Sequence, residues 1–133
     1  MAYLAAYVAA GVVFAVLDLL WLGVVARDFY RQNLAHLLRD PFNTPAAVAF
    51  YVFYLAGVLF FAIAPALAAQ SLKTAALYGF LLGVLAYGTY DMTNLATLRN
   101  WPLGVALVDI LWGGLLTAVA ATAGAAAARL VSG

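Results

Sequence analysis

Four long apolar stretches dominate the sequence, and most of its charged residues lie between them. The stretches cover residues 3–25, 46–69, 74–98 and 102–125. Each has the roughly 20 residues that a helix needs to cross a hydrocarbon core about 30 Å thick. A helix also satisfies its own backbone hydrogen bonds, which lipid cannot do. The sequence therefore predicts an all-α, polytopic membrane protein with a four-transmembrane-helix bundle in a single transmembrane domain, residues 1–133.

The composition agrees with a membrane protein and excludes several classes of function. Hydrophobic residues make up 68% of the chain and charged residues 8%, whereas a soluble domain has about 25% charged residues. A soluble fold of this size could not hide so much apolar surface. The net charge of +1 gives no reason to expect a nucleic-acid partner. The absence of cysteine excludes disulfides and thiolate chemistry.

Local signals indicate where the helices begin and end. Thr44 followed by Pro45 is typical of an N-cap and the first helical position. Pro65 is expected to kink or end the second helix. The connections that contain Lys73 and Arg99 are so short that the helices they join should be antiparallel neighbours.

The first connection, residues 26–45, is longer and amphipathic. Its apolar residues at helical spacing are Tyr30, Leu34, Leu37 and Leu38. This pattern predicts a short interfacial helix between the first two membrane helices, ended at Asp40-Pro41. The same pattern also fits a lid over the bundle, and the sequence does not distinguish the two.

Basic residues are unevenly divided between the two ends of the predicted bundle. Those in the first and third connections are Arg27, Arg31, Arg39 and Arg99. Lys73 and Arg129 lie at the other end. The positive-inside rule favours, by a narrow margin, termini outside the cytoplasm, and the opposite or a dual orientation stays open. The three arginines of the first connection are expected to contact anionic lipid headgroups.

Three aspartates lie inside the apolar stretches: Asp18, Asp91 and Asp109. Counted from Arg27 and Arg99 at 1.5 Å per residue, each lies roughly 12 to 15 Å below the interface. The first and third helices end on the side where the fourth begins, so all three acids should lie at one depth. Intramembrane acids are rare and usually mark a pathway or a site.

Hydrogen-bonding side chains accompany these acids. The run Asp18-Leu-Leu-Trp21 in the first stretch is repeated as Asp109-Ile-Leu-Trp112 in the fourth. Residues three apart share a helix face, so each acid has a hydrogen-bond donor beside it: Trp21 for Asp18, Asn94 for Asp91 and Trp112 for Asp109. The residues predicted to line a polar pocket are Asp18, Asp91, Asp109, Asn94, Trp21, Trp112, Tyr87, Tyr90 and Thr93.

The charge of these acids has no partner inside the stretches, which contain no Lys or Arg. Three neighbouring carboxylates in a low dielectric cannot all stay ionised. Some must be protonated, or a cation must lie among them, or they must face water. Alternatively, each acid accepts a hydrogen bond from another helix and only holds the bundle together. Oxygen ligands suit Mg²⁺ or Ca²⁺, but the sequence has no dedicated metal motif and names no cofactor.

Several runs of the sequence resemble a family of small bacterial membrane proteins of unknown function. They are Asp18-Leu-Leu-Trp21-Leu-Gly23, Thr89-Tyr90-Asp91-Met92-Thr93-Asn94, Trp101-Pro102-Leu103 and Val108-Asp109-Ile110. The resemblance extends along nearly the whole chain. It implies a four-helix protein of the bacterial inner membrane and supplies no activity.

Three functions are compatible with these features. The first is binding or transport of a cation or a small amphipathic ligand in the polar pocket, with protonation of an aspartate as the coupling event. The second is an enzyme that acts on a lipid or isoprenoid, with one carboxylate as general acid and another as base. The third is a structural or partner-binding membrane subunit. Membrane lipids and a second copy of the chain are the expected partners.

Overall fold

The chain folds into four long helices, as the sequence predicts. The computed structural model describes residues 1–39 and 41–132, and this part contains helices and no strands. The elements are α1 (Ala2–Leu20) with the π-helical turn η1 (Trp21–Val25), α2 (Arg27–Leu34), α3 (Thr44–Val58), the π-helical turn η2 (Leu59–Ile63), α4 (Ala64–Ala69), α5 (Leu72–Thr97) and α6 (Leu103–Ser132). α1 with η1, α3 through α4, α5, and α6 are each long and apolar enough to span a membrane.

The second membrane helix passes through Pro65 without ending there. The wider turn η2 directly precedes α4, in which Pro65 lies in the first turn, where a missing backbone N–H is tolerated. The helix starts one residue earlier than expected, because Asn43 is the N-cap and accepts a hydrogen bond from the backbone of Ala46. The fourth helix continues beyond residue 125 to Ser132.

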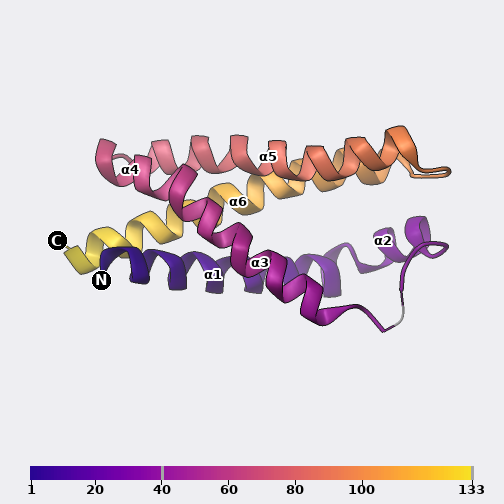
Figure 1. Ribbon diagram of the computed structural model, residues 1–133, viewed down its shortest axis with the longest axis horizontal. Coiled ribbons are helices and arrows are strands. Elements are labelled where there is room, and N and C mark those ends of the chain that lie inside the picture. The colour runs from indigo at the N-terminus through magenta and orange to yellow at the C-terminus, as the bar shows by residue number, and fades with distance from the viewer. Residues whose placement is uncertain (40, 133) are drawn as a thin grey trace.

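α6 is the central helix of the bundle. It packs against α5 along most of its length and against α1 on another side. Figure 1 shows α3 running obliquely between α5 at the upper edge and α1 at the lower edge. η2 and α4 pack on α5, whereas α3 makes few contacts with it. The first ten residues of α3 are exposed on nearly every side, so α3 and α5 diverge toward one end of the bundle.

Small residues allow α5 and α6 to lie very close together. A Cβ atom on Gly83 would collide with the backbone carbonyl of Gly113. A Cβ atom on Gly113 would collide with the ring of Tyr87, which packs flat over this glycine. Gly83 and Gly113 therefore let the two helix backbones approach closely, with the Tyr87 ring packed against Gly113.

α2 covers the end of the bundle where α5 and α6 are connected. Its Leu34 is buried with Trp101, Val105 and Ala106, so α2 lies over this end of the bundle and is referred to below as the lid, a position that an interfacial helix can also have. The expected helix end at Asp40-Pro41 is wrong, because α2 ends at Leu34 and only a turn follows. Leu37 and Leu38 are exposed and give the helix no buried face to extend along. Asp40 itself lies outside the described residues.

Candidate functional site

Asp18 is held by donors from two other helices. Nε1 of Trp112 in α6 donates to its Oδ1 atom at 3.2 Å. The hydroxyl of Tyr51 in α3 donates to its Oδ2 atom at 3.1 Å. The side chain is buried, and each of its two oxygens accepts a hydrogen bond. Asp18 thereby connects α1 to both α3 and α6.

Asp109 is bound by a residue of the lid. The Tyr30 hydroxyl donates to its Oδ1 atom at 2.9 Å and accepts a hydrogen bond from Nε1 of Trp21 at 3.1 Å. Burial raises the pKa of Tyr30 above its usual value; the Trp21 hydrogen bond opposes this rise and the Asp109 carboxylate adds to it. The phenol therefore keeps the proton that it donates. The Tyr30 side chain therefore links α2 by hydrogen bonds to Trp21 of η1 and Asp109 of α6.

The two Asp-x-x-Trp repeats interlock. The rings of Trp21 and Trp112 stack with their centroids 4.5 Å apart. The tryptophan of the α6 repeat donates to the acid of the α1 repeat. The tryptophan at the end of α1 reaches the acid of the α6 repeat through Tyr30. The repeated motif thus forms one crossed hydrogen-bond network rather than two separate ones.

Asp91 differs from the other two acids because it has no donor. Its side chain is fully buried, and neither oxygen has a hydrogen-bond partner in the described part of the chain. The carboxyl of Asp109 is its neighbour. Two adjoining carboxyl groups need a proton or a cation between them. Both alternatives stay predictions; among the described residues, no three acidic or histidine side chains are grouped to hold a metal ion.

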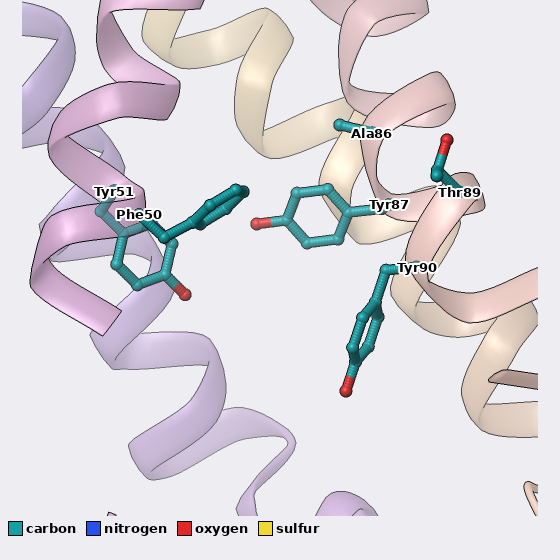
Figure 2. A pocket seen from close by; sticks show the side chains of 6 residues that line it. All are labelled: Phe50, Tyr51, Ala86, Tyr87, Thr89 and Tyr90. Atoms are coloured by element: carbon teal, nitrogen blue, oxygen red, sulfur yellow. The ribbon is translucent and has the colours of Figure 1, made fainter. Parts of the chain in front are cut away.

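A cavity of about 600 Å³ lies where α3 and α5 diverge. It is lined by Phe50, Tyr51, Ala86, Tyr87, Thr89 and Tyr90. Figure 2 shows the Tyr87 hydroxyl directed across this space toward Phe50 and Tyr51. Cavities for small ligands in proteins measure roughly 300 to 1,000 Å³ and are mostly apolar with a few polar groups. This cavity has those properties, and Tyr51 connects it directly to Asp18.

The predicted site residues are distributed between the cavity and the network behind it. Tyr87 and Tyr90 line the cavity. Those in the buried network or stacked within it are Asp18, Asp91, Asp109, Trp21 and Trp112. Asn94 is half-buried on α5, on the same stripe as Asp91. Thr93 is exposed, lines no part of the cavity, and makes no hydrogen bond with the three aspartates in the described structure.

Three residues that are central to the geometry were not predicted from the sequence to belong to the site. Phe50 and Tyr51 lie in α3, whose apolar stretch contains no acid to draw attention to it. Their only signal is a cluster of aromatic residues in residues 50–54. Tyr30 was expected on the apolar face of the interfacial helix, but not as a partner of an intramembrane acid.

The arginines of the first connection lie on the surface. Arg27, Arg31 and Arg39 are exposed. Arg31 and Arg39 line a groove of about 160 Å³ together with Leu38 and Phe42. This pairing of basic and apolar side chains suits a lipid headgroup, and that role stays a prediction.

Comparison with known proteins identifies a family and no activity. The model of a family described as "Predicted membrane protein (DUF2177)" matches residues 3–126, so the chain belongs to this family. No curated protein and no solved structure matches the chain significantly.

Proposed function

We propose that this member of the DUF2177 family of membrane proteins binds a small amphipathic ligand in the cavity between α3 and α5. The observation that carries the proposal is the combination of an aromatic cavity of about 600 Å³ with a buried carboxylate behind one wall. The apolar part of the ligand would lie against the rings. Its polar head would reach the hydroxyls of Tyr51 and Tyr87.

The position of the cavity supports entry from the lipid. The cavity lies where two membrane helices separate, so a lipid-dissolved molecule can reach it sideways without crossing the packed core. Around Gly83 and Gly113, by contrast, α5 and α6 are in close contact. Binding is therefore the part of a binding-or-transport function for which the geometry argues most directly.

The alternative of an acid–base enzyme has less support. Asp91 and Asp109 form the pair of carboxyls that such chemistry would use, but Asp91 is fully buried. A substrate in the cavity would meet Tyr51 and Tyr87 before either carboxyl. A purely structural role explains the bonded acids Asp18 and Asp109. It does not explain a buried carboxyl that has no donor.

Binding of decyl amphiphiles to the purified protein tests the proposal. The protein would be placed in phosphatidylcholine nanodiscs and titrated with decyltrimethylammonium, decanol and decyl sulfate, with empty nanodiscs as the blank. At least one probe should bind saturably. Ala86→Phe fills the cavity and should abolish that binding, whereas Ala15→Phe adds the same ring at an exposed site on α1 and should not. Absence of saturable binding for all three probes would contradict the proposal.

A further inference from the structure

We infer that the ligand of this cavity carries an organic ammonium group on an apolar tail, an inference that rests on the proposed function. Three properties of the described residues lead to it: the aromatic walls, the direction of the Tyr51 hydroxyl, and the three aspartates behind the cavity. A fourth property, an adjoining apolar groove, gives the place of the tail.

The walls of the cavity are aromatic faces. Phe50, Tyr51, Tyr87 and Tyr90 contribute four rings, and its remaining lining is one alanine and one threonine. The rings of Phe50 and Tyr51 meet edge to face at 5.9 Å. Ring faces attract cations through their quadrupole, and aromatic cages are a recurring way to bind alkylated ammonium groups. The lining has no Lys or Arg that would compete for them.

The Tyr51 hydroxyl presents only acceptor capacity to the cavity. Its single hydrogen is donated to Asp18, so its remaining lone pairs are what a ligand can meet. A positively charged head, or one with N–H donors, is attracted to such an oxygen. Beside Tyr51, a sulfate, phosphate or carboxylate head would face lone pairs instead, whereas the Tyr87 hydroxyl can accept from or donate to either kind of head.

Three aspartates lie behind the cavity, and the nearest basic residues along the chain are the interfacial Arg27, nine residues from Asp18, and Arg99, eight residues from Asp91. The membrane-spanning helices contain two basic residues, Lys73 in the first turn of α5 and Arg129 in the last turn of α6. They lie 18 and 20 residues along their helices from Asp91 and Asp109, which corresponds to about 27 and about 30 Å. Whichever of these acids is ionised, its negative charge attracts a cation and repels an anion. A cation is the ligand that this arrangement stabilises.

An apolar groove continues from the cavity and accounts for the tail. This groove, of about 340 Å³, shares Phe50, Ala86 and Thr89 with the cavity. It continues past Phe53 and Phe61, whose side chains are exposed along α3 and η2. An alkyl chain whose head lies beside Tyr51 can therefore extend along α3 toward the membrane interior.

Three ligands that share a decyl tail but differ in the charge of the head group test this inference. Saturation binding of radiolabelled decyltrimethylammonium would be measured in phosphatidylcholine nanodiscs, followed by displacement with decanol and decyl sulfate. The ammonium probe should bind about tenfold more tightly than either competitor, expressed as mole fraction in the lipid. Equal or tighter binding of decanol or decyl sulfate would overturn the ammonium assignment and leave the proposed function intact. Failure of all three probes to bind would overturn both.

A substitution that removes one ring supplies an independent test. Phe50→Leu keeps an apolar side chain but removes an aromatic face, and should weaken decyltrimethylammonium binding about three- to tenfold while decanol binding stays unchanged. Phe60→Leu is the matched control, because Phe60 is exposed and lines neither the cavity nor the groove. An equal loss for both probes in Phe50→Leu would show that the ring contributes volume only and would overturn the cation–π contribution.

Discussion

The indole rings of Trp21 and Trp112 stack with 11° between their planes, yet their Nε1 groups donate to different acceptors. Trp112 donates to Asp18, and Trp21 donates to Tyr30, which in turn donates to Asp109. The stack is therefore the point at which the networks of the two acids meet. Movement of one ring must disturb the partners of both acids.

Asp18→Asn should destabilise the protein. The amide keeps one acceptor oxygen, so one of the two donors, Trp112 or Tyr51, loses its partner and meets an N–H₂ group instead. A loss of about 1 to 3 kcal/mol is expected for a buried unsatisfied group. Asp28→Asn is the matched control at an exposed position and should change stability by less than about 0.5 kcal/mol. Reversible unfolding in mixed micelles measures both, and equal effects would contradict the assigned bonds.

Asp91→Asn, in contrast, should not destabilise the protein. The wild-type carboxyl has no donor to lose, and the new amide can donate to the adjoining Asp109 without a shared proton. We expect stability to stay unchanged or to rise by about 1 kcal/mol, the usual net contribution of a hydrogen bond. The same unfolding measurement applies. A loss as large as that of Asp18→Asn would show that Asp91 has a partner that the present geometry does not include.

Tyr30→Phe should loosen the lid while leaving the membrane helices folded. The substitution removes both hydrogen bonds of the hydroxyl, so α2 keeps only its apolar contacts through Leu34. Hydrogen exchange of backbone amides in residues 27–34 should become at least about fivefold faster, equivalent to about 1 kcal/mol. Tyr78→Phe, at an exposed tyrosine of α5, is the control and should leave exchange in α2 unchanged. Unaltered exchange in Tyr30→Phe would contradict the idea that the two hydrogen bonds of Tyr30 hold α2 in place.

Gly83→Ala should separate α5 from α6. The added Cβ would collide with the backbone carbonyl of Gly113, which cannot move aside as a flexible side chain would. Overpacking of this kind costs about 1 to 3 kcal/mol. Gly88→Ala on the same helix adds its Cβ into open space and should be neutral or stabilising by up to about 1 kcal/mol. Comparison of the two unfolding curves measures the difference, and similar curves would contradict the close approach.

The four helices could be predicted from the sequence because their apolar runs are as long as a membrane is thick. Local details that depend on packing against neighbouring helices could not be predicted. The π-helical turn η2 before Pro65 has no pattern of its own in the sequence. α6 continues past residue 125 because the alanine-rich end remains a good helix, although Arg129 suggests an interface there. The close approach of α5 and α6 at Gly83 and Gly113 likewise depends on which faces of the two helices meet.

The candidate site could likewise be predicted only in part. The shared depth of Asp18, Asp91 and Asp109 follows from counting residues along helices. Which acid meets which donor depends on the rotation of each helix about its axis, so the Asp91–Asp109 contact required the fold. Tyr51 also required it, because nothing in an acid-free apolar helix marks one tyrosine as the neighbour of an aspartate on another helix.

The most direct test of the account is to locate a bound ammonium head in the structure. Crystals of the protein grown in a lipidic phase with decyltrimethylarsonium would replace the nitrogen by arsenic, whose anomalous scattering marks the head group. The account predicts one strong peak among the rings of Phe50, Tyr51 and Tyr87, with the alkyl chain extending along α3. A peak only at the exposed surface, or an empty cavity at saturating probe, would contradict it.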